Sequence, residues 1–397
     1  MEQGASMRLV TFLAVVLAVV LGGCVGPPVL ERQVLGYDEV TSELEQKLLL
    51  LNIARVDAGR PIHFTTTSSI AATFDWTTTV GVGAQVEEPS GTNFFNFNWG
   101  ASASENPTFS IIPISGKEFT KRILTPFDDG AFQFLVFQGG AIDRVMRLMA
   151  SGIEEQNPDG SFVRFISNNP DQPEEYEEFR RIATHLRWLN ESRKLFVRSL
   201  VFEETLVANY AGAISPGDIN SGFSEGLQWR QKPDGNFELT RLQAGRVVVT
   251  NYDPMRLSDR ERLELNEKIS KNPAGFVYVD VRADGPGGDL PIQGALKLRS
   301  VLQMLQFIGN GFVVAPEFDV EPDRRTGAVT DNPVATLKIN VVDSKPVSRL
   351  ASVQYGGRYY SVNDTPWDRA TFATLGDLFQ TAVGEVENVG IPVTISK

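Results

Sequence analysis

The chain has 397 residues, of which 42% are hydrophobic and 22% are charged, and its formal net charge is −12 at pH 7. This composition is ordinary for a folded protein and excludes a wholly disordered chain, and the length is sufficient for two or more domains. The acidic balance argues against nucleic acid as the main partner and against electrostatic attraction to anionic lipid, because both are negatively charged. A membrane attachment would therefore be apolar or covalent.

The first two dozen residues have the layout of a bacterial secretory signal. Residues 7–24 read MRLVTFLAVVLAVVLGGC, with one arginine, an apolar run from Leu9 to Leu21 and small residues before Cys24. The apolar run is too short to span a bilayer comfortably, as is typical of a signal peptide. The sequence LGGC resembles the lipobox, whose cysteine is diacylated and becomes the first residue of the mature protein. Cys24 is the only cysteine, which excludes a disulfide within the chain.

This resemblance implies a signal peptide over residues 1–23 and a lipidation site at Cys24. Val25 and Gly26 follow the cysteine, so no aspartate stands directly after it to resemble the inner-membrane retention signal. We therefore expect an outer-membrane lipoprotein that is anchored on the periplasmic side. Two or more acyl chains would make this anchoring stable. The alternative is an uncleaved signal anchor or a buried core segment.

The next two segments are a tether and a helix. Residues 24–37 contain two prolines and are predicted to be a lipidated tether. Residues 38–62 are predicted to contain an N-terminal helix from Asp38 or Thr41 to Ala58. Acidic residues fill the first turns of this helix, and a glycine and a proline after Ala58 end it.

Residues 63–114 predict a long amphipathic β-hairpin. Over residues 64–86 large apolar side chains alternate with threonine, serine and glycine, and the alternation resumes after a turn at residues 89–91. Antiparallel pairing about that turn brings the apolar faces together, with Val80 opposite Trp99. The predicted membrane- or partner-facing residues are Phe64, Ile70, Phe74, Trp76, Val80, Val82, Phe95, Phe97, Trp99, Phe109 and Ile111.

Three environments could cover the apolar side of this hairpin: the core of a globular body, lipid around a channel to which several copies contribute one hairpin each, or the surface of a partner. Each strand has roughly 20 residues, or about 65 Å at about 3.3 Å per residue, whereas strands of globular proteins usually have five or six residues. Glu105 and Pro107 break the pattern, so we expect a bulge or an exit from the apolar zone there.

The remaining chain mixes helices and strands without regular βαβ spacing, which predicts an α+β fold with mixed helices and antiparallel strands. Residues 115–215 are predicted to be mainly helical, with the strongest helix over residues 174–192. Residues 216–397 are predicted to form an α+β C-terminal region. There we expect a helix over residues 294–309 and a hairpin turn at YGGRYY, residues 355–360.

The sequence offers little catalytic chemistry. His63 and His185 are the two histidines, and together with a lipidated Cys24 they cannot build a common His/Cys metal cluster. A Ser-His-Asp triad would need one of the same histidines, and no G-x-S-x-G motif is present. We therefore expect no catalytic residue, no metal, no cofactor and no enzymatic activity.

Other polar and aromatic groups have ordinary interpretations. Carboxylates at residues 321–331 could pair for acid–base chemistry, but acidic loops are common in a chain of this charge. Arginines at helical spacing, which predict a solvated face, are Arg180, Arg181, Arg187 and Arg193. Aromatic residues that could stack on a glycan, with hairpin packing as the simpler interpretation, are Tyr355, Tyr359, Tyr360 and Trp367.

Three segments resemble uncharacterised proteobacterial outer-membrane lipoproteins: NPTFSIIPISGKEFTKRILTPF, GGAIDRVMRLMASGI and VQYGGRYYSVND with the following ATFATLGDLFQTA. Those proteins also carry a long Ser/Thr/Gly-rich hairpin before an NPT segment. The resemblance implies a lipoprotein and supplies no activity, ligand or functional residue.

Taken together, the sequence predicts a lipoprotein held in the membrane by acylated Cys24 that self-assembles through its hairpin into an oligomeric channel or scaffold for envelope transport. Its expected partners are further copies of itself or an envelope protein, and no nucleic acid. The alternative is a monomeric periplasmic lipoprotein that binds a protein partner or cell-wall glycan without catalysis.

Overall fold

A computed structural model describes residues 26–84, 95–114, 116–346, 350–383 and 393–395, with the backbone alone at 26–30, 32–33, 66–84, 95–114 and 393–395. The chain has an α+β fold and divides into two compact units. The first unit contains the residues up to Leu49, His63–Ser115 and Glu387–Lys397. The second unit contains Leu50–Ile62 and Gly116–Val386.

Helix α2 (Gly26–Asp57) starts earlier than the sequence predicts. Residues 26–37 are helical, so the prediction of a tether over residues 24–37 is wrong where the structure describes it. The two prolines fit at the start of α2 because the backbone N–H groups of a first turn have no intrahelical partner. The end of the helix at Asp57 agrees with the predicted end at Ala58.

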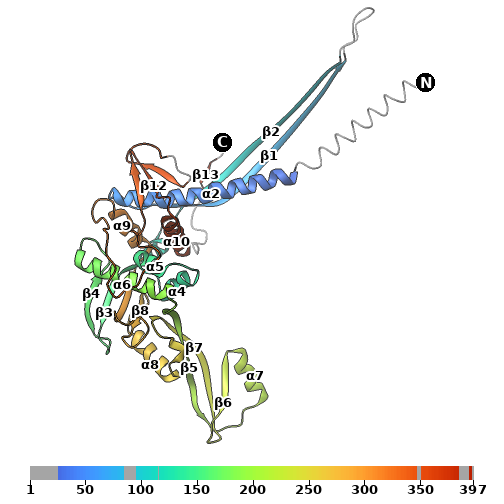
Figure 1. The fold of residues 1–397 in the computed structure, drawn as a ribbon. Helices are drawn as coiled ribbons and strands as arrows, with labels where there is room; N and C mark the ends of the chain where they lie inside the picture. Colours follow the sequence, from blue (N-terminus) through green and yellow to red (C-terminus); the bar gives the residue numbers. More distant parts are fainter. Residues whose placement is uncertain (1–25, 85–94, 115, 347–349, 384–392, 396–397) are drawn as a thin grey trace, which may run out of the picture. The chain divides into compact units, whose positions relative to one another are not determined.

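The sheet of the first unit contains β1 (Phe64–Ala84), β2 (Phe95–Ile114) and β13 (Val393–Ile395), in the order β1-β2-β13. Strands β1 and β2 are antiparallel and run side by side (Figure 1). Val80 lies opposite Trp99, as the alternation predicts. That the two strands form an amphipathic hairpin stays a prediction, because residues 85–94 and the strand side chains lie outside the described part.

The irregularity between β1 and β2 is not where the sequence places it. Glu105 lies opposite Phe74 and Pro107 opposite Ala72 without a shift of register, whereas the register shifts between Thr67 and Ser69. The first predicted alternative, a bulge at residues 105–107, is therefore wrong, and the second, an exit from the apolar zone, stays a prediction. A proline costs no ladder hydrogen bond at a position whose nitrogen faces away from the paired strand, so it does not by itself force a bulge.

The second unit contains the remaining helices and strands. Its first half has α3 (Lys117–Leu124), α4 (Asp129–Phe137), α5 (Ile142–Met149), β3 (Ala150–Gln156), β4 (Phe162–Ser167), α6 (Pro173–Glu191), β5 (Phe196–Tyr210), α7 (Pro216–Ser224) and β6 (Leu227–Gln231). Its second half has β7 (Phe237–Thr250), a 3-10 turn (Pro254–Arg256), α8 (Asp259–Ile269), β8 (Phe276–Val281), β9 (Ile292–Leu298), α9 (Val301–Asn310), β10 (Ile339–Val342), β11 (Ser352–Tyr355), β12 (Arg358–Val362) and α10 (Pro366–Val383).

The largest sheet among the described residues has seven strands in the order β4-β3-β9-β8-β7-β5, with β6 paired to part of β7. Its pairs are antiparallel except for the parallel pair β7–β8. A smaller sheet has the order β10-β12-β11. Pairing of β5 with β7 crosses residue 215, so the predicted boundary between 115–215 and 216–397 does not separate compact units.

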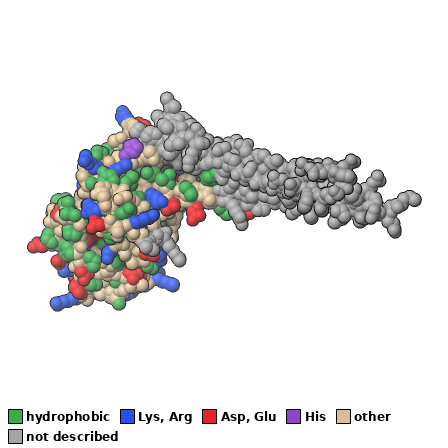
Figure 2. Space-filling model, turned by 90° about the horizontal axis from the view of Figure 1, so that it is seen from above, with side chains coloured by type: hydrophobic (Ala, Val, Ile, Leu, Met, Phe, Trp, Pro, Cys, Tyr) green, Lys and Arg blue, Asp and Glu red, His purple; other side chains and the backbone are tan. Residues whose placement is uncertain are grey.

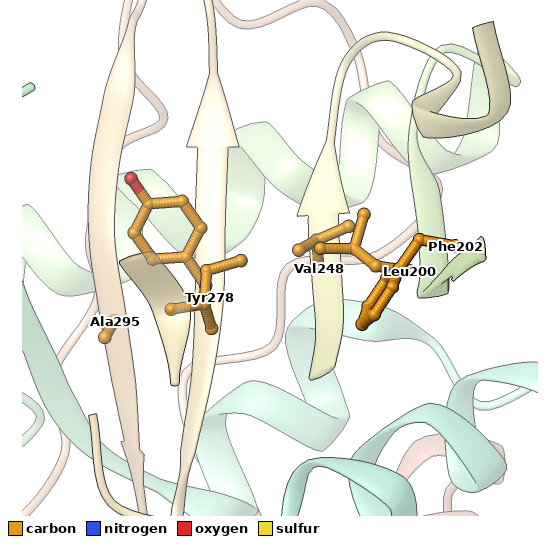
Figure 3. Close-up of a cluster of buried hydrophobic side chains, with 6 residues drawn as sticks. Leu200, Phe202, Val248, Tyr278 and Ala295 are labelled. Atoms are coloured by element: carbon orange, nitrogen blue, oxygen red, sulfur yellow. The ribbon is translucent and has the colours of Figure 1, made fainter. Parts of the chain in front are cut away.

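A hydrophobic cluster covers one face of the large sheet across β5, β7, β8 and β9 (Figure 3). It contains Leu200, Phe202, Val248, Ile269, Tyr278 and Ala295. Two leucines of α8 pack against it, so this helix covers the cluster with its apolar side. A capping box between Ser258 and Glu261 fixes the start of α8.

Two strands lie where the sequence predicts helix. Residues 294–298 belong to β9 and only Val301–Asn310 of the predicted helix is helical. Residues 150–156 form β3, although the region 115–215 is predicted to be mainly helical. Both strands are largely buried on both faces, so they lack the alternation by which a half-exposed strand is recognised.

Candidate functional site

The backbones of the predicted hairpin residues lie in β1 and β2. Cys24 and residues 1–23 lie outside the described residues, as do the side chains of the ten predicted residues from Ile70 to Ile111. Phe64 is described, and its side chain is only 1% exposed. Its prediction as a membrane- or partner-facing residue is therefore wrong, because at the first position of β1 this side chain is already covered.

The backbone of β1 forms an open edge. In the sheet order β1-β2-β13, β1 has β2 on one side and no described strand on the other. The opposite edge of β2 is paired with β13 only at Phe109–Ile111. Unpaired N–H and C=O groups along a strand edge are a template for another strand, so this sheet is a candidate assembly surface.

The edge of β1 lacks the features by which proteins protect such edges. Over its 21 residues the strand contains one charged residue, Asp75, and no lysine or proline. Charges, prolines and short length are the usual protections of an edge strand, and β1 has almost none of them.

No helix within the described residues is long and apolar enough to cross a membrane.

The second unit contains a buried arginine cluster that the sequence does not reveal. Arg147 of α5 and Arg180 of α6 are each 1% exposed. Both guanidinium groups donate to the carbonyl oxygens of Pro333 and Val334, at 2.8 to 3.1 Å. The prediction that Arg180 lies on a solvated face is therefore wrong. We call these two arginines and the two carbonyls the arginine clamp.

Glu317 supplies the negative charge beside the arginine clamp. Its Oε1 lies 3.4 Å from Nη2 of Arg147 and accepts hydrogen bonds from the hydroxyls of Tyr176 and Thr336 at 2.8 and 2.7 Å. Burial, together with the charge of Glu317, raises the pKa of Tyr176 above its ordinary range. Burial lowers the pKa of Arg147, and Glu317 acts in the opposite direction.

A third buried arginine ties three backbone segments together. Arg299 donates to the carbonyl oxygens of Arg147, Leu148 and Asn168 at 2.8 to 3.1 Å, and its guanidinium lies 3.8 Å from the ring centroid of Phe307. Burial lowers the pKa of Arg299 to about 9. Its hydrogen bonds join the end of α5, the start of α9 and the loop before α6.

The arginine clamp holds the α9–β10 segment (residues 311–338) against α6. This segment has no helix or strand, and side chains of α5 and α6 satisfy two of its backbone carbonyls, those of Pro333 and Val334. Further along α6, the side chain of His185 is fully buried and lies 3.0 Å from both the hydroxyl of Thr326 and the carbonyl of Gly287. Burial lowers the pKa of His185.

The polar groups that could have carried chemistry have structural partners. His185 is enclosed by the two contacts just described, and His63 is exposed. Asp323 forms an ion pair of 2.7 Å with Arg325, and the hydrogen bond from Arg325 lowers its pKa. In the described parts of the chain, no group of three or more His, Cys, Asp and Glu residues could hold a metal ion.

The aromatic residues considered for glycan stacking are mostly covered. Tyr360 is 1% and Trp367 is 8% exposed, while Tyr355 and Tyr359 are half-buried. The Tyr360 hydroxyl donates to Asp57 at 2.8 Å, and burial together with this contact raises its pKa to about 12. Packing is therefore the role that the structure supports for Tyr360 and Trp367.

Comparison with known proteins found no matching protein-family model, no matching curated protein and no matching solved structure. The candidate assembly surface therefore rests on the geometry and sequence of this chain alone.

Proposed function

We propose that this chain is a membrane-anchored lipoprotein of the cell envelope that assembles through β1 and β2 into an oligomeric channel or scaffold for envelope transport. The observation that carries the proposal is the edge of β1, which no strand in the described part of the chain pairs and which has one charge and no proline along its 21 residues. The lipobox-like sequence before Cys24 supports the anchor.

The length of the edge makes pairing with another chain favourable. At about 3.3 Å per residue, β1 is about 70 Å long. An isolated pair of strands is marginally stable in water, and a third strand or a packed face is needed for stability. The strand β13 supplies three residues only. Strands from neighbouring copies would supply the remaining pairing. Lipid around the closed channel would cover the apolar residues that the sequence places on one side.

A register-matched deletion tests the assembly. Ala72 lies opposite Pro107, so replacement of residues 73–106 by Gly-Ser-Gly-Ser leaves the paired base of both strands in place. We expect the full-length protein to be an oligomer in mild detergent and the shortened protein to be a monomer, because the open edge is removed. The measurement is the molecular mass by light scattering after size-exclusion chromatography.

A deletion of equal length elsewhere serves as the control. Thr205 lies opposite Thr240 in the pair β5–β7, so residues 206–239 can be replaced by the same linker. This variant is expected to remain oligomeric, and thermal melts check that both variants stay folded. Assembly that survives the deletion of residues 73–106 would contradict the proposal.

The anchor has a separate test. Cys24→Ser removes the only thiol of the chain and should abolish labelling by radioactive palmitate in growing bacterial cells, because acylation requires this sulfur. The variant should also leave the membrane fraction, since the acyl chains supply the apolar attachment. Labelling that persists in the Cys24→Ser protein would show that the anchor is wrongly assigned.

A further inference from the structure

A cavity of about 300 Å³ lies in the second unit between the first half of α6, the strands β3, β4 and β9, and the α9–β10 segment. Its volume is at the lower end of the range for small-molecule sites, about 300–1,000 Å³. Four isoleucines line it, each less than 10% exposed: Ile153, Ile166, Ile182 and Ile292. These side chains give the cavity an apolar lining that is set by the packing of α6 on the sheet.

The charged side chains that line the cavity are mostly carboxylates. They are Glu155, Glu174, Glu178, Asp323, Arg181 and Arg325. The positive charges are already engaged: Arg325 pairs with Asp323 at 2.7 Å, and Arg181 pairs with Glu177 at 2.8 Å. An anionic ligand in the cavity would therefore have to displace Asp323 from Arg325 or Glu177 from Arg181.

The remaining carboxylates carry an excess of negative charge. Glu155 and Glu178 share the guanidinium of Arg164. Its Nε lies 2.7 Å from Oε2 of Glu155, and its Nη2 lies 2.6 Å from Oε1 of Glu178. Glu174 is exposed and forms no ion pair within the described parts of the chain. On the face of the protein shown in Figure 2, by contrast, acidic and basic side chains are interspersed.

We propose that this cavity binds a primary amine on an aliphatic chain. The ammonium group would lie at the carboxylates Glu174, Glu178 and Glu155, and the methylene chain would lie on the isoleucines. An aliphatic amine contacts both parts of the lining. An inorganic cation would leave the isoleucines without an apolar partner, and a neutral hydrocarbon would leave the carboxylates without a cation. The lining has no cluster suited to a metal ion among the described residues.

A neighbouring depression extends the site. It has a volume of about 480 Å³ and shares Arg181, Asp323 and Arg325 with the cavity. Glu321, Pro322 and Arg324 also line it. The part of a ligand that continues beyond the aliphatic chain therefore has room next to the cavity. A linear diamine and a lysine side chain of a peptide both fit this chemistry.

Three small probes test the proposal on the full-length protein. Hexylamine carries the charge and the chain, hexanoate carries the chain with the opposite charge, and ammonium carries the charge alone. We expect hexylamine to move the NMR signals of the δ1 methyl groups of Ile153, Ile182 and Ile292, and hexanoate and ammonium to leave them unchanged at equal concentration. Failure of hexylamine to move these signals, or an equal effect of hexanoate, would overturn the proposal.

A matched pair of variants tests the role of the free carboxylate. Glu174→Gln should weaken hexylamine binding about threefold or more in calorimetry, because one exposed charge contributes modestly. Glu264→Gln removes another exposed charge, on α8, where Glu264 pairs with Arg260 at 2.8 Å, and should leave the affinity unchanged. Equal weakening by both variants would mean a non-specific charge effect and would refute the site.

The two sources of the amine are separated by a final comparison. Binding of 1,6-diaminohexane more tightly than acetyl-lysine amide would identify a free diamine as the ligand type, and the reverse order would identify a lysine of a peptide. Absence of binding by both would again refute the proposal.

Discussion

At the scale of single residues, the arginine clamp joins α5 and α6 to the α9–β10 segment through two buried guanidinium groups. Arg180 was predicted to be solvated because charged residues at helical spacing usually mark an exposed face. Arg180 donates to the carbonyl oxygens of Pro333 and Val334, about 150 residues further along the chain, to the side chain of Asn332, and to the hydroxyl of Tyr176 one turn earlier in α6. Most of these acceptors are distant in sequence, and a tyrosine four residues before an arginine occurs on exposed helix faces as well, so no local pattern predicts the burial of Arg180.

The arginine clamp gives the first prediction at this scale. Arg180→Ala should lower the free energy of unfolding by about 3–5 kcal/mol, because removal of one member of a buried polar network leaves the others without partners. Urea unfolding followed by circular dichroism measures the change. Arg181→Ala is the matched control, since the neighbouring Arg181 is 40% exposed, and it should change the stability by less than about 1 kcal/mol.

His185 gives a prediction for pH. Burial lowers its pKa in the folded protein below the ordinary value of 6.5, so the unfolded chain takes up a proton first as the pH falls. The contribution of His185 to stability is therefore complete above about pH 6.5 and is lost as the pH falls from there through the folded-state pKa. The charged groups around it are Asp323, Arg325 and Asp289.

Urea titrations at several pH values measure this dependence. The His185→Gln variant should have a flatter stability profile between about pH 6.5 and 5 than the unchanged protein, because the titrating group is gone. Parallel profiles for the two proteins in this range would refute the role of His185.

At the scale of elements, the type of most helices followed from local signals, whereas buried strands did not. The sequence predicts α6 over residues 174–192, and the structure has it at Pro173–Glu191. The prediction succeeds because the acidic residues at the start and the helical spacing of apolar residues both indicate the same helix. The sequence of β9 predicts the start of a helix, since Ala295, Leu296 and Leu298 are all buried and show no alternation of exposure. Only pairing with β3 and β8 distinguishes such a strand from a buried helix.

The capping box of α8 gives a prediction for one element. The Ser258 side chain accepts from the backbone N–H of Glu261, so Ser258→Ala should destabilise the protein by about 1 kcal/mol. Ser270 at the other end of α8 makes no cap hydrogen bond through its side chain among the described contacts, and Ser270→Ala should leave the stability nearly unchanged. Thermal unfolding of the two variants, compared with the unchanged protein, measures the difference.

At the scale of the whole molecule, the account depends on what happens at the open edge of β1. The sequence predicted two long antiparallel strands, and it also predicted the pairing of Val80 with Trp99. It could not predict which edge stays free, because that depends on the short strand β13 from the other end of the chain, which pairs with β2 and not with β1. An edge of this length that no described strand pairs, with one charge, is unusual for a protein that acts alone.

The number of chains in the detergent-extracted particle is the most direct test of this account. The account predicts a discrete assembly of several 43.7 kDa chains, or slightly less per chain once a signal peptide is removed, that persists on dilution. A particle with the mass of one chain at every protein concentration would contradict it.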